Sequence, residues 1–425
     1  MRVCIRYSPG TPSISFTYPH HRMMWEPELP RPLPAYFLQE VFSTAPIYDL
    51  ILCDLSPRTL VWLSRTCCRA HEAVTHFICR AYNINRHLSR CFPDPLAFRS
   101  LQARTGLVIS GSNTLQFLDR SFYPESDLDL YAHPGHVYEA LEWLESVGYK
   151  FQPEAWKQQQ RDWRDEVSAD WDGTARRITD HGEMTIDFEP DMEYSEVAGV
   201  YTFTRSVAMD TGTVVLKVQI IATKCNPIQT ITQFHSTCVM NIITFDAAYS
   251  FYPVATFEER MAIQIPGSNR LDVVKKYVQR GWRVYAVFGP EHVTHPQLFL
   301  LNEKRWVGDR HCWSIPLDTT GVTPRPALSL SSEHFSWDPS IQNGWIMECE
   351  GVSAVTHVPR MRTHLVMITV FRYNYNFPDD KLTKAIRNWS LSQGQLNHAQ
   401  LTKQNWIWFD AEIPRFRGVL SSHEQ

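Results

Sequence analysis

The sequence predicts an α+β fold in which helices flank a sheet, preceded by a short helical segment. Between Leu107 and Val147, strand-like apolar runs alternate with helical patterns, an alternation typical of a sheet covered by helices. The runs Val200–Val207 and Val214–Ala222 flank a Met-Asp-Thr-Gly turn and predict a hairpin. From Pro46 to about Phe92 the apolar residues recur at helical spacing instead.

Length and composition fit a globular protein of more than one domain. The chain has 425 residues, of which 44% are hydrophobic, enough for two or three packed units. We expect a proline-rich leader at 1–45, a helical segment at 46–95, the main domain at 100–285, and an extension of uncertain fold at 286–425. The leader carries Pro27, Pro30, Pro32 and Pro34, so we expect it to lack regular structure.

Charge and targeting signals narrow the classes of partner. The formal net charge is −4 with both signs interspersed, so nucleic acid is not indicated as a partner. No apolar stretch has the length of a signal peptide or of a membrane span, so we expect no membrane partner. The ten cysteines form no CxxC pair, which argues against a zinc site and a disulfide framework. We therefore expect an intracellular protein, cytoplasmic or nuclear.

The chemistry-bearing residues lie in the first strand-helix-strand unit. An apolar strand ends in Ser110-Gly111-Ser112, a helix follows at 113–120, and Asp127 and Asp129 lie on the next strand, 127–131. Alternate residues of a strand point to one face, so both carboxylates are presented together. Carboxylate oxygens are ligands that Mg²⁺ prefers, so we expect Asp127 and Asp129 to bind the metal and act in catalysis.

The glycine-serine loop is suited to bind the phosphates of a nucleotide. Gly111 permits close approach of the backbone to a phosphate, and the amides at the start of the following helix attract anions. With the Ser112 hydroxyl they would hold the terminal phosphates of a nucleoside triphosphate, while the metal orients the α-phosphorus. We therefore expect Gly111 and Ser112 to bind nucleotide.

This arrangement resembles the signature of the DNA-polymerase-beta-like nucleotidyltransferase superfamily. The resemblance covers about 100–285. It extends to the segment Phe234–Asn241 and to Arg270, Lys276, Tyr277, Arg280 and Gly281, which look like a later helix of nucleotidyltransferase-like proteins common in fungal genomes. It implies a mixed sheet with flanking helices, and Mg²⁺ and a nucleoside triphosphate as cofactors.

The third acid of that family is missing from the matching strand, which reads Val-Gln-Ile-Ile with Gln219 at the metal position. An amide can coordinate through its carbonyl oxygen, but it neither balances a second Mg²⁺ nor accepts a proton from an attacking hydroxyl. Asp187, between Ile186 and Phe188, has suitable surroundings to replace it if its segment joins the sheet.

The segment from Pro46 to Arg69 resembles an F-box. The resemblance implies a Skp-type adaptor of cullin ubiquitin ligases as partner, bound through apolar residues of short helices. The candidates for that contact are Leu50, Ile51, Leu55, Leu60 and Leu63. The alternative is an ordinary helical cap on the main domain.

Two functions follow from these patterns, and a third possibility, a scaffold that binds no nucleotide, would require the glycine-serine loop to be structural. The first is a nucleotidyltransferase-fold protein with weakened or lost catalysis, a pseudoenzyme that acts as a nucleotide-binding or recognition and adaptor module. The second is an active Mg²⁺-dependent nucleotidyltransferase. Asp210-Thr211-Gly212 imitates an aspartic-protease loop, but it occurs once, so we interpret it as the hairpin turn.

Overall fold

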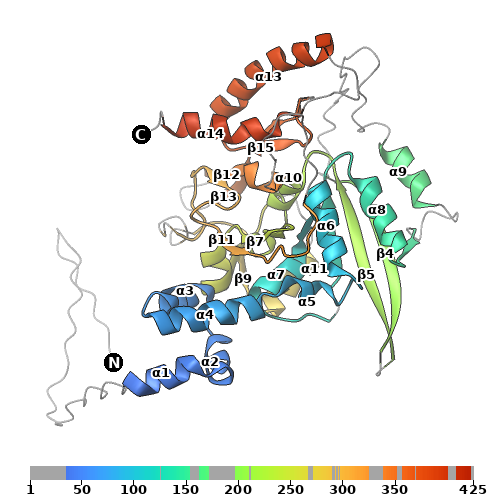
Figure 1. The fold of residues 1–425 in the computed structure, drawn as a ribbon. Coiled ribbons are helices and arrows are strands. Elements are labelled where there is room, and N and C mark those ends of the chain that lie inside the picture. Colours follow the sequence, from blue (N-terminus) through green and yellow to red (C-terminus); the bar gives the residue numbers. More distant parts are fainter. Residues whose placement is uncertain are drawn as a thin grey trace, which may run out of the picture.

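The structure is a computed structural model with an N-terminal helical region and an α+β body (Figure 1). It describes residues 35–124, 126–153, 162–171, 197–209, 212–266, 271–289, 292, 295, 297–324, 338–351, 357–368, 370–400 and 408–422. None of the described helices is long and apolar enough to cross a membrane.

An eight-stranded mixed sheet forms the centre of the molecule. Its strands, in spatial order, are β11 (Trp313–Pro316), β7 (Ala247–Ser250), β6 (Asn241–Ile243), β1 (Val108–Ser110), β2 (Leu128–Ala132), β5 (Gly212–Thr223), β4 (Val197–Met209) and β3 (Lys150–Gln152). All neighbours are antiparallel except β2 and β5. The predicted hairpin is confirmed as β4–β5, with Met209 opposite Gly212.

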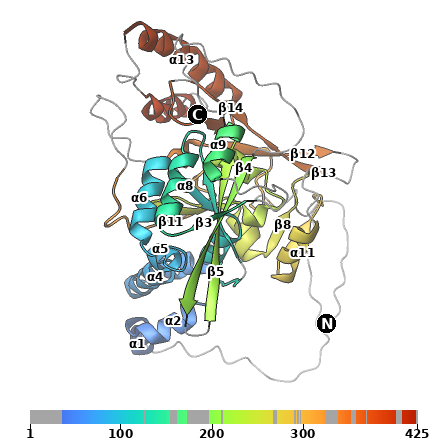
Figure 2. The ribbon, with the colours of Figure 1, turned by 90° about the vertical axis from the view of Figure 1, so that its right-hand side faces the viewer.

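Helices cover one face of this sheet, as Figure 2 shows. They are α5 (Ile84–Leu88), α6 (Pro95–Thr105) and α8 (Val137–Ser146). Their apolar sides pack with alternate strand residues such as Leu128, Leu130 and Val218 in one core. α9 (Trp163–Trp171) lies against β4, and α7 (Gly111–Asp119) connects β1 to β2.

The other face carries the side chains of opposite parity, among them Tyr131 and Ile221, in a second core. Around this face lie α10 (Pro227–Thr232), short helical turns at Thr237–Val239 and Val254–Glu258, and the paired strands β8 (Met261–Ile263) and β9 (Arg283–Tyr285). α11 (Leu271–Gln279) joins β8 to β9 and lies on this side in Figure 2.

The N-terminal helices form a small packet with its own core. They are α1 (Ala35–Ser43), α2 (Ala45–Leu52), α3 (Pro57–Ser64) and α4 (Cys68–Ala81). The Ser56 hydroxyl accepts a hydrogen bond from the amide of Thr59 and so caps the start of α3. The prediction that 1–45 lacks regular structure is wrong for α1, because its apolar side packs on the packet; 1–34 lie outside the described residues.

Beyond 285 the chain extends the main sheet and adds two smaller ones. β11 pairs with β7 at the sheet edge, so a strand from the predicted extension belongs to the central sheet. The others are β10 (Arg305–Trp306), β12 (Gly344–Gly351), β13 (His357–Arg362), β14 (His364–Val366) and β15 (Tyr375–Phe377), with a 3₁₀ turn at Pro339–Gln342. Near the C-terminus, α13 (Asp380–Gln400), a 3₁₀ turn at Asp410–Glu412 and α14 (Ile413–Ser422) lie over the top of Figure 1.

Candidate functional site

The two aspartates lie at the end of β2 nearest to the start of α7. Ser110 of β1 is opposite Asp129 in the antiparallel register, and Asp127 comes one residue before β2 begins. On the other side, the parallel register aligns Asp129 with Gln219 of β5. The fold therefore brings the glycine-serine loop, both aspartates and Gln219 together on one face of the sheet.

Gly111 packs directly on Asp129. Its φ is +71°, a left-handed conformation that favours glycine. A Cβ atom added there would lie 2.7 Å from Asp129 Oδ2, closer than non-bonded atoms approach. The backbone of the loop thus lies against the carboxylate, and any larger residue would have to displace the loop or the carboxylate.

The Asp129 carboxyl has an unusual proton affinity. Burial, and then the negative charge of Asp127, raise its pKa from 3.8 to about 7, against the lowering effect of Lys217 and Lys276. The carboxyl therefore holds its proton to a much higher pH than an ordinary aspartate does. A bound cation would favour the ionised form, so metal binding and deprotonation of Asp129 are linked.

Lys217 occupies the position beside Asp127. Its Nζ lies 2.6 Å from Asp127 Oδ2, so an ammonium group already balances this carboxylate. Sequence reasoning missed Lys217, although strand alternation places it on the same face as Gln219 two residues later. The partner could be found only once β5 was known to run parallel to β2.

Gln219 donates from Nε2 to Thr202 Oγ1 of β4 at 3.2 Å, so its amide is held by the neighbouring strand. Asp187, the predicted substitute ligand, lies outside the described residues. Among the residues that the structure describes, no group of three or more His, Cys, Asp or Glu side chains is placed to hold a metal ion. The described carboxylates at this site are a pair.

The first turn of α7 has no side-chain cap. The Ser110 hydroxyl donates to the carbonyl of Asn241 at 2.6 Å instead of capping the helix. Ser112 Oγ lies 2.5 Å from the Oγ of Ser126, the residue that precedes Asp127. Amides without a side-chain acceptor at a helix start are suited to an anion such as phosphate.

α11 supplies positive charge near Asp129. Lys276 is exposed and lies near enough to lower the Asp129 pKa, while Tyr277 beside it is buried. The Arg280 guanidinium lies 3.6 Å from the ring centre of Tyr123, which fixes it over the loop before β2. Of the predicted helix residues, Arg270 lies outside the described part of the chain.

Comparison with protein families, with curated proteins and with solved structures finds no match to this chain.

Proposed function

We propose that this chain is a nucleotidyltransferase-fold protein that binds a nucleoside triphosphate and has weakened or lost catalysis. The ion pair between Lys217 and Asp127 carries the proposal. This ion pair neutralises Asp127, one of the two carboxylates that a catalytic metal requires. Gln219, which lies in register with the other carboxylate, Asp129, supplies no negative charge. The chain then acts as a nucleotide-binding or recognition module.

The charge balance of the site supports binding over chemistry. Asp127 is paired with Lys217, and burial together with the charge of Asp127 raises the pKa of Asp129 to about 7, which opposes its ionisation. Lys276 and Arg280 stand on the side where phosphates would lie. Such a site attracts a polyphosphate, but it holds one Mg²⁺ weakly, a second hardly at all, and lacks a base for the acceptor hydroxyl.

Calorimetry with each of the four common nucleoside triphosphates, with and without Mg²⁺, tests the binding. We expect at least one to bind, and Lys276→Ala to weaken it. No binding of any triphosphate under either condition would refute the nucleotide site.

Catalysis is tested separately with labelled triphosphate. Wild-type turnover should be slow or absent, and Gln219→Asp should raise it, because general-base assistance is worth about 10²–10⁴-fold. Gln219→Leu is the matched control, since it keeps the volume without the carboxylate. Fast wild-type turnover that is unchanged in Asp127→Asn would contradict the assignment of the site.

An active Mg²⁺-dependent nucleotidyltransferase is the second candidate, favoured by the retention of Gly111 packed on Asp129. It requires a third ligand, from Asp187 or from the substrate. Fast wild-type turnover that is lost in both Asp127→Asn and Asp187→Asn would favour it.

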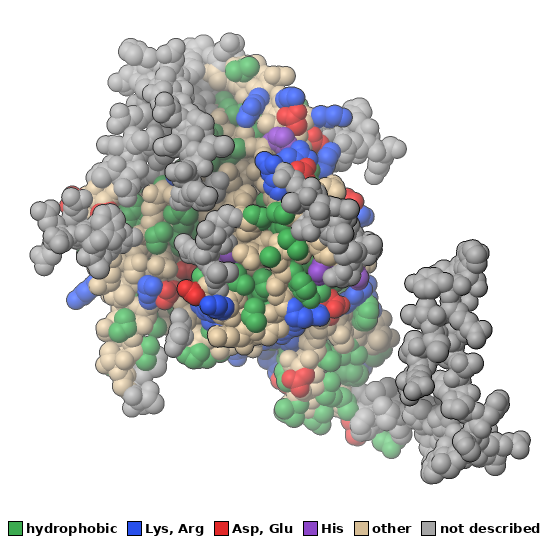
Figure 3. Space-filling view, turned by 180° about the vertical axis from the view of Figure 1, so that it is seen from behind, with side chains coloured by type: hydrophobic (Ala, Val, Ile, Leu, Met, Phe, Trp, Pro, Cys, Tyr) green, Lys and Arg blue, Asp and Glu red, His purple; other side chains and the backbone are tan. Residues whose placement is uncertain are grey.

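The helical packet supports a further part of the proposal, an adaptor role inside the cell. Apolar side chains gather on its outer surface, toward the lower right of Figure 3. The exposed ones are Tyr36, Ile47, Leu50, Ile51, Val61 and Trp62. Leu50 is 74% exposed. The apolar surface around it suits docking into an apolar groove of a Skp-type adaptor.

The predicted contact residues need one correction. Leu60 is only 1% exposed and packs inside the helical packet, so it is wrong as a contact residue and its substitution would unfold the packet. Co-purification of the full chain with a Skp-type adaptor should instead be lost in Leu50→Asp. Val215→Asp, on the exposed part of β5, is the matched control and should retain binding; failure of the wild-type chain to co-purify leaves the packet as a cap on the sheet domain.

A further inference from the structure

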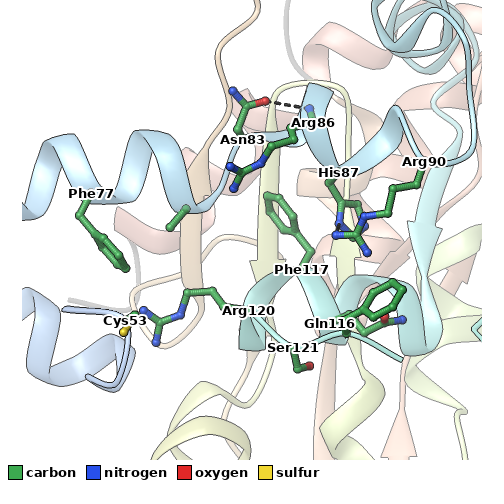
Figure 4. Close-up of a pocket in the computed structure, with 12 residues that line it drawn as sticks. Cys53, Phe77, Asn83, Arg86, His87, Arg90, Gln116, Phe117, Arg120 and Ser121 are labelled. Atoms are coloured by element: carbon green, nitrogen blue, oxygen red, sulfur yellow. Dashed lines mark hydrogen bonds between the residues drawn. The ribbon is translucent and has the colours of Figure 1, made fainter. Parts of the chain in front are cut away.

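A cavity of about 350 Å³ lies between the helical packet and the sheet domain (Figure 4). α4, α5 and their connection line one side, and α7 with the residues after it lines the other. In Figure 4, side chains from both layers point into the space between them. Small-molecule sites of this size are common where two parts of a chain meet.

The cavity is positively charged. Among the residues that the structure describes, its lining contains Arg86, Arg90 and Arg120 and no carboxylate. Within the described part of the chain, none of these three arginines forms an ion pair. Guanidinium groups without a balancing carboxylate attract an anion, and phosphate and carboxylate match their planar array of donors.

One of the arginines is held in place by a hydrogen-bond relay. Burial lowers the pKa of His87 to about 4, so its ring is neutral at physiological pH. Nε2 donates to Asn113 Oδ1 at 2.8 Å, which leaves Nδ1 to accept from Arg90 at 3.3 Å. The Arg90 guanidinium is therefore oriented before any ligand arrives.

Arg86 is also tied down, because its terminal nitrogen donates to the carbonyl of Arg80 at 3.0 Å. Arg120 has a different task, since it donates to the carbonyls of Leu52 and Leu55 and holds the packet on the sheet domain. Because both terminal nitrogens of Arg120 make these contacts, Arg86 and Arg90 supply the terminal guanidinium donors for a ligand.

Aromatic rings stand beside these cations. The Arg90 guanidinium lies 5.1 Å from the ring centre of Phe122, which is 63% exposed, and Phe117 also lines the cavity. An exposed phenyl ring next to Arg90 suits a ligand that is anionic at one end and flat and apolar at the other.

We propose that this cavity binds a small organic anion, whose phosphate or carboxylate group contacts Arg86 and Arg90 and whose apolar body packs on Phe117 and Phe122. The proposal does not rest on the nucleotide site. The two sites share α7 but no lining residue, because the cavity contacts its second half and the aspartates lie at its start.

Calorimetry on the full chain with phenyl phosphate, inorganic phosphate, benzoate and phenol tests this inference. We expect phenyl phosphate or benzoate to bind at least about tenfold more tightly than inorganic phosphate or phenol, because only the first two supply both charge and ring. The stronger of the two identifies the class of anionic group.

Arg86→Gln and Arg90→Gln should each weaken that binding about tenfold, the effect of one charge-assisted hydrogen bond. Arg69→Gln, an exposed arginine of α4 outside the cavity, and Lys276→Ala, at the aspartate site, should leave it unchanged. Thermal unfolding of each variant without ligand checks that it is folded. No binding of either aromatic anion, or binding that both cavity variants retain, overturns the inference.

Discussion

Gly111→Ala tests the central packing contact of the candidate site. Two effects act together at this position. Alanine in the left-handed conformation costs about 1–2 kcal/mol in the free energy of unfolding, and a Cβ atom 2.7 Å from Asp129 Oδ2 forces the carboxylate to move. Overpacking of this kind costs about 1–3 kcal/mol, so we expect a total loss of about 2–5 kcal/mol.

Gly135→Ala separates the two effects. Gly135 also has a left-handed backbone, with φ of +82°, but nothing lies within 4 Å of the Cβ position. This variant should therefore lose only the conformational part, about 1–2 kcal/mol. The difference between the two variants, measured by urea denaturation, is the contact with Asp129.

The same contact should control ligand binding. Gly111→Ala should abolish Mg²⁺-dependent binding of the triphosphate, because the displaced carboxylate leaves the metal position, while Gly135→Ala should bind like the wild type. Equal losses of stability in the two variants, with nucleotide binding intact in both, would refute the reasoning that the loop is fitted to Asp129.

Three further outcomes follow from the charges at the site and at the packet. Lys217→Met should tighten Mg²⁺ binding by about tenfold or more, as titration calorimetry would measure, because Asp127 loses its partner; weaker metal binding would show that Lys217 organises the pair rather than competes with the metal. Folding raises the Asp129 pKa from 3.8 to about 7, so this carboxyl stabilises the fold most below about pH 4, and its contribution falls until about pH 7. The wild type should thus lose about 2 kcal/mol relative to Asp129→Asn between pH 5 and pH 7.5, and equal pH dependence of the two would contradict the shift. Arg120→Ala should lower the free energy of unfolding by about 2 kcal/mol or more and expose the packet to proteolysis, because the side chain donates to the Leu52 and Leu55 carbonyls; Arg65→Ala, an exposed arginine after α3, should not.

The parts of the fold that sequence predicts well are those set by local periodicity. The last helical pattern between Leu107 and Val147 is α8, and the two runs that flank Gly212 pair as the expected hairpin. The shared face of Asp127 and Asp129 also follows from strand alternation alone. These features depend on residues that are close together in the sequence, so the local sequence pattern is enough to predict them.

Other features depend on pairing between distant segments. The contact of Lys217 with Asp127 joins residues 90 positions apart and exists because β5 runs parallel to β2. β11 reaches the sheet edge from beyond 285, where no periodic signal marks it. Leu60 and Leu50 are both apolar on short helices, and only the packing of four helices decides that one is core and the other surface.

The glycine of the loop has a structural explanation that needs no nucleotide. Its φ and its contact with Asp129 would select glycine even in a scaffold, so Gly111 by itself does not distinguish a binding module from a structural one. The start of α7 distinguishes the two better than the glycine does. Its first turn lacks a side-chain cap because the Ser110 hydroxyl donates to the carbonyl of Asn241 instead. A nucleotide-binding module predicts that a polyphosphate accepts hydrogen bonds from these amides, whereas a scaffold predicts no ligand there, so the proposed binding site depends on the helix start rather than on the glycine.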